Sequence, residues 1–299
     1  MEITTHFAQF VQDGRYLRGW SPRTAAIYQT ALDSFLQFKS GLEEDPSKGG
    51  SPERKLVTKS ELDAWVVTMR REARSAGGCN VLIRSMNSFL SWLYEQGHLS
   101  APLRVKPQPS PAKPLDSFSE ADVQALLSFK ARTPFQLRAW VLTLCLMDTG
   151  IRIDEALGLE RSKVDLDAGF IRVLGKGRKE RVVPFSREFR KHLFRLVRQP
   201  GDGPYVFHAA RGQRLRYRNV YRDIRRVCEL AGVSGARIHP HAFRHFFAVN
   251  YIRSGGDIYR LSRILGHTSI ATTQLYLRSM TNEQVGEAHR SPLTPRLSA

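Results

Sequence analysis

Residues 239–278 read HPHAFRHFFAVNYIRSGGDIYRLSRILGHTSIATTQLYLR, and the rest of the chain is organised around this stretch. It places an arginine, several histidines and a tyrosine within a segment whose apolar spacing otherwise predicts packed helices. His241 and Arg244 are three residues apart, so a helix carries them on one face. His267 begins a shorter segment that ends at Tyr276. These residue types predict a site that holds a phosphate and attacks it.

The whole chain carries a large excess of positive charge. Its 299 residues include 46 Lys and Arg against 28 Asp and Glu, which gives a formal net charge of +18. Such an excess predicts a polyanionic partner, most often nucleic acid, and the alternative is a basic protein that is merely soluble. The most basic stretch is residues 211–244, where nine arginines face only Asp223 and Glu229 as acidic residues.

Composition excludes several classes of protein. With 41% hydrophobic residues, the chain has enough apolar surface for two folded domains of ordinary size. Cys79, Cys145 and Cys228 are odd in number and far apart, which predicts free thiols in a reducing compartment. The sequence shows no secretory signal pattern and no stretch apolar enough to cross a membrane. We expect a cytoplasmic, nucleoid-associated bacterial protein without membrane contact.

Residues 1–100 show only helical periodicity and are predicted to form a small helical bundle. Three amphipathic helices are expected there. Their boundaries are a cap at Ser21 before Pro22, a cap at Thr58 or Ser60, a break at Gly77-Gly78 after the second helix, and an end at Gly97.

The remaining residues divide by composition. Residues 101–117 are predicted to be a proline-rich linker, because five prolines fall within residues 101–114 and favour an extended tether. Residues 118–280 mix helical stretches with short β-branched runs at 163–184, which predict two or three antiparallel strands. Residues 281–299 are predicted to be a polar tail. The expected fold class is therefore mainly α with a small antiparallel β-sheet.

Phosphodiester exchange without a metal sets clear chemical requirements. The pentavalent phosphorane carries about two negative charges, which two arginine forks can hold bidentately. An acid must protonate the leaving 5′-oxygen, a base must deprotonate the nucleophile, and a covalent nucleophile conserves the bond energy for rejoining. The candidates, in chain order, are Arg152, Lys176, His241, Arg244, His267 and Tyr276.

Two of these candidates have plainer interpretations. Arg152 follows an apolar helix and is expected to be buried unless it faces a site, but it could instead pair with Asp154 or Glu155 on the helix surface. Glu155 can orient Arg152 in either case. Lys176 lies between two glycines at the tip of a predicted hairpin, where it could be an ordinary solvated lysine.

The histidines and the tyrosine also admit other roles. His239, His241 and His245 could be metal ligands, although no cysteine or carboxylate clusters beside them to complete a site. His267 follows a glycine at a helix end and could be only a cap. Tyr276 could be a half-buried amphipathic side chain. Each residue is weak evidence alone, and the order, the spacing and the net charge together favour a site.

Four motifs resemble those of the tyrosine recombinases, the phage-integrase and Xer class. They are TGIRIDEALGL at 149–159, LGKGRKERVVP at 174–184, HPHAFRH at 239–245 and LGHTSIATTQLY at 265–276. The match is close over residues 119–278, whereas residues 1–100 resemble the family's core-binding domain in layout only. The resemblance implies a helical, SAM-like core-binding domain followed by an α+β catalytic domain. One departure is Phe243, where the family usually has leucine, and this apolar exchange leaves the chemistry intact.

The resemblance also implies a role for each candidate. Arg152 and Arg244 would bind the scissile phosphate, and Lys176 would be the acid toward the 5′-oxygen. His241 would be the general base or a proton shuttle, and His267 would hydrogen-bond the phosphate. No cofactor, metal or ATP is implied, because each transesterification conserves the phosphodiester.

Tyr276 would be the nucleophile and would form a 3′-phosphotyrosyl bond with double-stranded DNA. The resemblance implies a recombination site with inverted half-sites, on which a homotetramer, or a tetramer with a related recombinase, exchanges strands through a Holliday junction. Residues 281–289 are the candidate segment for docking on a neighbouring protomer. We expect a site-specific recombinase that serves DNA integration, excision or resolution, including transposition of a mobile element.

Two alternatives remain open. A type IB topoisomerase uses nearly the same chemistry but relaxes supercoils without a defined site. A DNA-binding regulator or architectural protein on this fold would bind DNA without forming a covalent product. Because no further DNA-binding domain is seen before the helical bundle, a Xer-like or transposon recombinase is favoured over a larger phage integrase.

Overall fold

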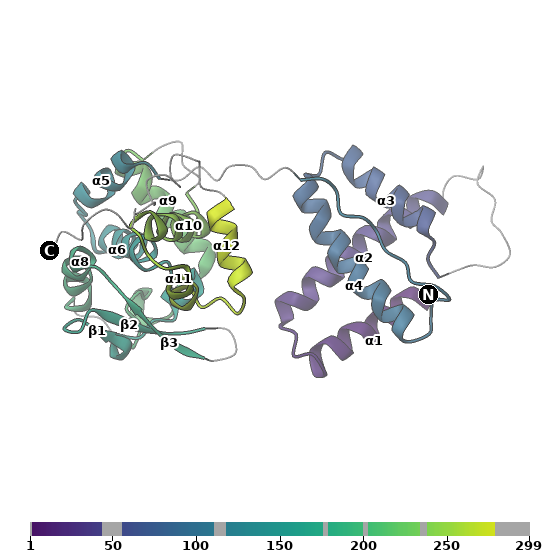
Figure 1. Ribbon diagram of the computed structural model, residues 1–299, viewed down its shortest axis with the longest axis horizontal. Coiled ribbons are helices and arrows are strands. Elements are labelled where there is room, and N and C mark those ends of the chain that lie inside the picture. Colours follow the sequence, from purple (N-terminus) through teal and green to yellow (C-terminus); the bar gives the residue numbers. More distant parts are fainter. Residues whose placement is uncertain are drawn as a thin grey trace, which may run out of the picture. The chain divides into compact units, whose positions relative to one another are not determined.

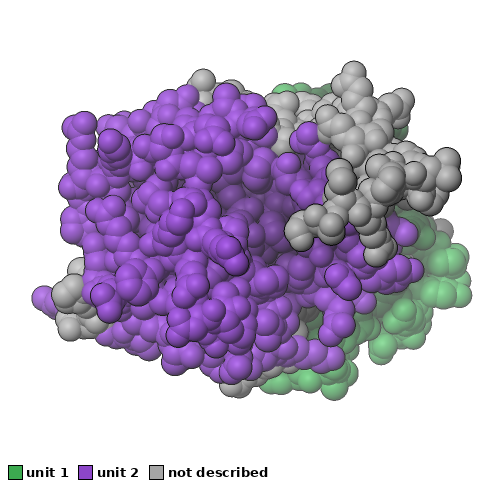
Figure 2. All heavy atoms as spheres, turned by 60° about the vertical axis from the view of Figure 1, so that its left-hand side comes forward, with its two compact units in different colours: residues 1–112 green, residues 113–299 purple. Residues whose placement is uncertain are grey.

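The computed structural model describes residues 2–43, 56–110, 118–175, 179–199, 203–233 and 238–278. The chain divides into two compact units, residues 1–112 and 113–299, which have different colours in Figure 2. Each unit has its own hydrophobic core. The described residues are mainly helical with one small antiparallel sheet, which confirms the predicted fold class.

The first unit is a bundle of helices (Figure 1). Its core is rich in aromatic side chains. Its helices are α1 (Glu2–Tyr16), α2 (Pro22–Glu43), α3 (Lys59–Arg71) and α4 (Ala76–Glu95). The predicted starts of α2 at Pro22 and of α3 after Thr58 are confirmed, and Thr58 forms a capping box with Glu61. Helix α1 has no counterpart among the three predicted helices. It is held by apolar residues at helical spacing that reach the core, among them Phe7 and Phe10.

One predicted boundary in this unit is wrong. Gly77 and Gly78 lie inside the first turn of α4, whereas α3 already ends at Arg71. The hydroxyl of Ser75, the N-cap of α4, accepts a hydrogen bond of 3.1 Å from the N–H of Gly78. A favourable cap therefore outweighs the low helix propensity of two glycines.

Residues 101–110 of the proline-rich segment have an extended backbone, as predicted, and lie along α4 within the first unit. Two asparagines of α4 pair with the backbone of this segment in both directions, as a neighbouring strand would. Asn87 pairs with Val105 at 2.9 Å in each direction, and Asn80 pairs with Gln108 at 2.8 and 2.7 Å. The side chain of Val105 is buried in the core. Residues 111–117 of the predicted linker lie outside the described part of the chain.

The second unit combines helices with the sheet. Its helices are α5 (Glu120–Ser128), α6 (Pro134–Thr149), α7 (Ile153–Leu157), α8 (Arg187–Val197), α9 (Tyr217–Leu230), α10 (Pro240–Arg253), α11 (Ile258–Leu265) and α12 (Ile270–Arg278), with short 3-10 helices η1 (Arg161–Lys163) and η3 (Ala210–Gly212). The strands β1 (Val164–Asp165), β2 (Phe170–Leu174) and β3 (Glu180–Pro184) pair in that order, and both pairings are antiparallel. The meander predicted at 163–184 is confirmed.

Helix α6 is the centre of the second unit. It is apolar on nearly every side, and α8, α9 and α10 pack around it. Thr133 caps its start, and the helix ends at Gly150, whose φ of 62° is left-handed. The chain turns sharply at this glycine and enters α7. Arg152 is therefore placed at the C-terminal end of the central helix.

The cysteines take no part in a disulfide. Cys79, Cys145 and Cys228 are buried free thiols, as the sequence predicts. Burial raises the pKa of Cys145 and of Cys228 to about 12, so both stay protonated at neutral pH. In the described ranges of the chain, no helix has both the length and the apolar character needed to cross a bilayer.

Candidate active site

Arg152 is the N-cap of α7, and its position is fixed by a buried carboxylate. Its backbone N–H donates to Glu155 Oε2 at 2.8 Å, and its Nη1 donates to Glu155 Oε1 at 3.1 Å. The Glu155 side chain is 6% exposed, whereas that of Arg152 is 39% exposed. The pair with Glu155 exists, but it is not the surface ion pair of the plainer interpretation. The Arg152 side chain therefore remains partly accessible to solvent or to an anion.

Arg244 lies on α10 and is 3% exposed. Its Nη1 donates to the carbonyl of Gly150 at 2.8 Å, and its Nη2 donates to the carbonyl of Leu265 at 2.7 Å. Burial lowers the pKa of Arg244, and its interaction with Tyr276, which includes a side-chain hydrogen bond, acts in the opposite direction. The guanidinium remains charged at any physiological pH. It joins the ends of α6 and α11 to the tyrosine of α12.

His267 follows Gly266, the left-handed C-cap of α11. Its Nε2 lies 2.8 Å from Arg244 Nη2, and its Nδ1 lies 2.8 Å from Thr273 Oγ1. Because a guanidinium only donates, Nε2 must accept, and the ring proton resides on Nδ1 and is donated to Thr273. Burial, followed by the charges of nearby arginines, lowers the pKa of His267 to about 4. The imidazole is therefore neutral at neutral pH.

Tyr276 lies on α12 beside this network. Its ring is stacked on that of His267, with centroids 6.0 Å apart and an interplanar angle of 16°. The ring of His245 also contacts that of Tyr276, with centroids 5.5 Å apart and an interplanar angle of 44°. Since Tyr276 also hydrogen-bonds Arg244, the phenol lies at the arginine and not away from it.

The other predicted residues are placed differently. His241 lies in the first turn of α10, and its side chain is exposed. Lys176 lies outside the described residues, between the end of β2 at Leu174 and the start of β3 at Glu180. The structure thus brings Arg152, Arg244, His267 and Tyr276 together, and it leaves His241 at the surface of the same helix as Arg244.

Two of the alternative metal ligands have structural roles. His239 is the N-cap of α10, and its Nδ1 accepts a hydrogen bond of 3.1 Å from the N–H of Ala242. His245 is buried against Tyr276. Over the residues that are described, no group of three or more His, Cys, Asp or Glu side chains is arranged to hold a metal ion.

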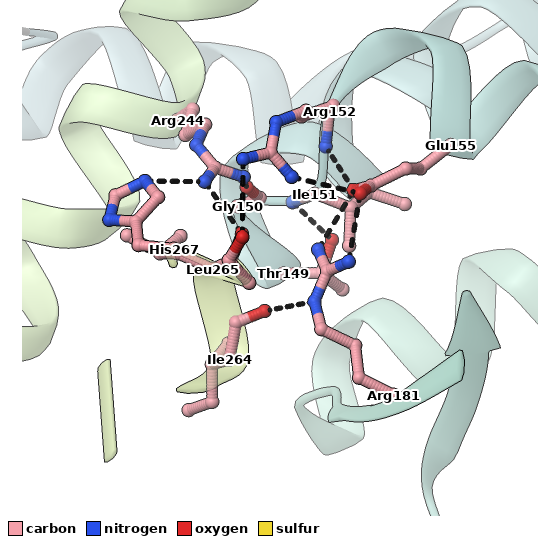
Figure 3. A network of polar contacts seen from close by, with 11 residues as sticks. Thr149, Gly150, Ile151, Arg152, Glu155, Arg181, Arg244, Ile264, Leu265 and His267 are labelled. Carbon is pink, nitrogen blue, oxygen red and sulfur yellow. Dashed lines mark hydrogen bonds and ion pairs between the residues drawn. The ribbon is translucent and has the colours of Figure 1, made fainter. Parts of the chain in front are cut away.

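Arg181 is absent from the predicted set but lies inside the network (Figure 3). Its Nη1 and Nη2 donate to the two oxygens of Glu155, each at 2.8 Å, and its Nε donates to the carbonyl of Ile264 at 2.7 Å. The available signal is the alternation of β3, in which Arg181 shares the inward face with Val183. A charge at an inward strand position requires a partner.

The network concentrates positive charge and N–H donors, which are the groups that suit an anion. Figure 3 shows the guanidinium groups of Arg152 and Arg244 close to each other and to His267. The charge of Arg152 contributes, after burial, to the lowered pKa of Arg244. Two positive forks, a neutral imidazole and a phenol suit a tetrahedral phosphate that is attacked by the phenol oxygen. Burial is the main cause of the lowered pKa of His267, and this concentration of positive charge lowers it further.

Comparison with known proteins agrees with this geometry. The family model described as "Phage integrase family" matches residues 116–283. Tyrosine recombinase XerC of Yersinia pestis is 31% identical over 274 residues, which cover 88% of this chain and 87% of that protein. The fold is similar to a crystal structure of XerH site-specific recombinase bound to palindromic difH substrate in a post-cleavage complex. The TM-score is 0.73 at 18% identity, and the match covers 94% of this chain and 82% of the XerH chain. It is also similar to the Tn1549 transposon integrase in complex with circular intermediate DNA, with a TM-score of 0.70, 18% identity, and coverage of 94% and 97%. The motif resemblance is confirmed, and the chain belongs to the phage integrase family of tyrosine recombinases.

Proposed function

We propose that this protein is a site-specific recombinase that cuts and rejoins double-stranded DNA through a 3′-phosphotyrosyl bond at Tyr276. The observation that carries the proposal is the meeting of Arg244, His267 and Tyr276 beside Arg152 in a chain of this family. A covalent phosphotyrosine keeps the energy of the broken phosphodiester, so rejoining needs no external energy source.

The arginines supply most of the charge in this proposal. Arg152 and Arg244 bind the non-bridging oxygens of the scissile phosphate and stabilise the charge that develops as Tyr276 attacks. The phosphate competes for the Arg244 N–H that His267 Nε2 accepts, and the imidazole then reorients to donate to the phosphate. Lys176 protonates the leaving 5′-oxygen. His241 stands at the exposed start of α10, where it acts as the base or relays a proton.

The partner DNA and the assembly form the next part of the proposal. XerH is described on a palindromic substrate, and a recombination site with inverted half-sites has the same symmetry. We assign this chain a homotetramer, or a tetramer with a related recombinase, that exchanges strands through a Holliday junction. The likeness to tyrosine recombinase XerC supports site-specific recombination, and the likeness to a transposon integrase supports integration or excision of a mobile element. The site of action is then the bacterial nucleoid.

Helix α9 offers a basic surface for the DNA backbone. Its apolar residues Val220, Ile224 and Val227 are buried, and exposed arginines occupy the opposite face. These arginines are Arg218, Arg222, Arg225 and Arg226. Such a face binds phosphates irrespective of base sequence and positions the site on the duplex.

The decisive experiment traps the covalent intermediate. Wild-type protein is incubated with host genomic DNA and denatured, and sequencing of the covalently recovered DNA defines the site. A nicked duplex of that site then serves as a suicide substrate. We expect the wild-type protein and the control Tyr259→Phe, which changes an exposed tyrosine of α11, to accumulate the adduct. Tyr276→Phe should form none.

Each of the other possible results would indicate a different nucleophile or a different function. An adduct with Tyr276→Phe would move the nucleophile to another residue. Tight DNA binding by the wild type without any adduct would indicate a non-catalytic DNA-binding protein. Relaxation of supercoiled plasmids that lack the recovered site would indicate a type IB topoisomerase.

A further inference from the structure

Three successive carbonyl groups at the C-terminal end of α11 each accept a hydrogen bond from a different arginine. The pairs are Arg181 Nε with Ile264 at 2.7 Å, Arg244 Nη2 with Leu265 at 2.7 Å, and Arg152 Nη2 with Gly266 at 3.3 Å. The last carbonyls of a helix lack partners within the helix and lie at its negative end, so they favour cations. Two of these arginines are the proposed phosphate ligands, and the third is Arg181.

Arg181 also neutralises Glu155. It binds both carboxylate oxygens at 2.8 Å, whereas the side chain of Arg152 reaches only one of them, at 3.1 Å. Burial raises the pKa of Glu155, but the hydrogen bonds from Arg181 and from the backbone of Arg152 outweigh it and leave the pKa below its usual value. Glu155 is therefore ionised at neutral pH. Two guanidiniums share one carboxylate, which leaves one net positive charge.

The backbone before His267 packs directly on the Arg181 guanidinium. A β-carbon added at Gly266 would lie 2.9 Å from Arg181 Cζ, so the two groups are in close contact. The Arg181 side chain is 13% exposed and is enclosed by this backbone and by Glu155. Its position is thus coupled to β3, to α7 and to the turn that carries His267.

We propose that Arg181 is a positioning residue for the strand-cleavage reaction, because it takes up the charge of Glu155 and so leaves the charge of Arg152 available to the scissile phosphate. Without Arg181, the buried carboxylate of Glu155 would pair fully with Arg152 and cancel the charge that the phosphate requires. Arg181 acts through Glu155 and the end of α11 and does not touch the reacting atoms. The inference rests on the proposed function and adds one residue to it.

The first test compares Arg181→Met in two backgrounds. The readouts are single-turnover adduct formation on the suicide substrate, DNA affinity and thermal unfolding. In the wild-type background we expect cleavage to slow by about 100-fold, with DNA affinity changed less than about threefold. In the Glu155→Gln background the same substitution should slow cleavage by less than about tenfold, because no carboxylate remains to cancel the charge of Arg152. The control Arg190→Met removes an exposed arginine paired with Asp167 at 3.2 Å and should leave cleavage unchanged.

The second test changes the charge of the substrate. A methylphosphonate at the scissile position lacks one negative oxygen and depends less on Arg152. The ratio of wild-type to Arg181→Met cleavage rates should shrink from about 100-fold to less than about tenfold on this substrate. Arg181→Lys keeps the charge but loses the planar guanidinium, so its cleavage rate should lie between those of the wild type and Arg181→Met. It replaces the Met variant if that variant does not fold.

Several results would overturn the inference. An equal loss on both substrates and in both backgrounds would make Arg181 a structural residue only, and an Arg181→Met protein as fast as the wild type would remove any role. Wild-type protein that forms no adduct would instead refute the proposed function. Adduct formation by the wild type, followed by failure of these ratios, refutes only the role of Arg181.

Discussion

The protonation of His267 is set by the residues that surround it. Its Nε2 accepts from Arg244, and burial together with the arginine charges lowers its pKa from 6.5 to about 4. In the unfolded chain the imidazole binds a proton below about pH 6.5, whereas in the folded chain it does so only near pH 4. Between these values the unfolded state binds more protons, so acid favours unfolding.

This difference predicts how stability responds to pH. The free energy of unfolding of the wild-type protein should fall as the pH is lowered from 6.5 toward 4. His267→Gln lacks this imidazole and should lose less stability over the same interval. Urea unfolding of both proteins at about pH 7.5, 5.5 and 4.5 measures the difference. If the free energy of unfolding depended on pH in the same way for both proteins, His267 would not be held neutral by its surroundings.

Sequence motifs locate the residues that this site brings together, but they do not find all its parts. Arg152, Arg244, His267 and Tyr276 are recognisable because their order and spacing are preserved within short motifs. Arg181 lies within the motif at 174–184 and at an inward position of β3, but its role is not recognisable, because its partners Glu155 and Ile264 are 26 and 83 residues away in the chain. The hydrogen bond between His267 and Arg244 is equally non-local, and no pattern in the sequence reveals that His267 accepts it.

Among the elements, the end of α6 supports the site most directly. Gly150 is left-handed, its carbonyl accepts a hydrogen bond of 2.8 Å from Arg244, and an added β-carbon would lie 2.3 Å from Phe247 Cδ1. The same residue ends the helix, supports an arginine and contacts α10. A side chain here therefore disturbs packing and active-site geometry together.

We expect Gly150→Ala to destabilise the protein by about 2 kcal/mol or more, the sum of left-handed strain and overpacking. It should also slow adduct formation, because the carbonyl that holds Arg244 would shift. Gly232→Ala is the matched control, since Gly232 is also left-handed but has open space around its α-carbon. Thermal unfolding and single-turnover cleavage of both variants test this. Equal losses of stability and of cleavage rate in the two variants would refute the special role of the α6 end.

Elements are predictable from sequence where local chemistry decides them. The start of α2 at Pro22 and the cap at Thr58 follow from residues within one turn of each helix. The contact of residues 101–110 with α4 cannot be predicted in this way, because it depends on Asn80 and Asn87, which are 28 and 18 residues away from their partners.

For the whole molecule, the net charge of +18 predicts that DNA binding weakens strongly as salt is added. If roughly six phosphates are bound, affinity should fall by about 10³-fold between about 50 and 200 mM salt, with a linear dependence of log affinity on log salt. Replacing Arg218 and Arg222 of α9 by Gln should reduce the slope by about one for each phosphate that the variant no longer binds. Fluorescence anisotropy over a salt series measures both slopes. A flat response would contradict binding through the phosphate backbone.

The covalent bond between Tyr276 and DNA is the claim on which the other conclusions depend. Trypsin cleaves after Arg263 and Arg278, and the resulting peptide, residues 264–278, contains Tyr276 as its single tyrosine. The most direct measurement is mass spectrometry of the trapped adduct after digestion with nuclease and trypsin. We predict a nucleotide attached to Tyr276 in this peptide. A nucleotide attached to any other peptide, or an unmodified peptide 264–278 from a confirmed adduct, would contradict the assignment.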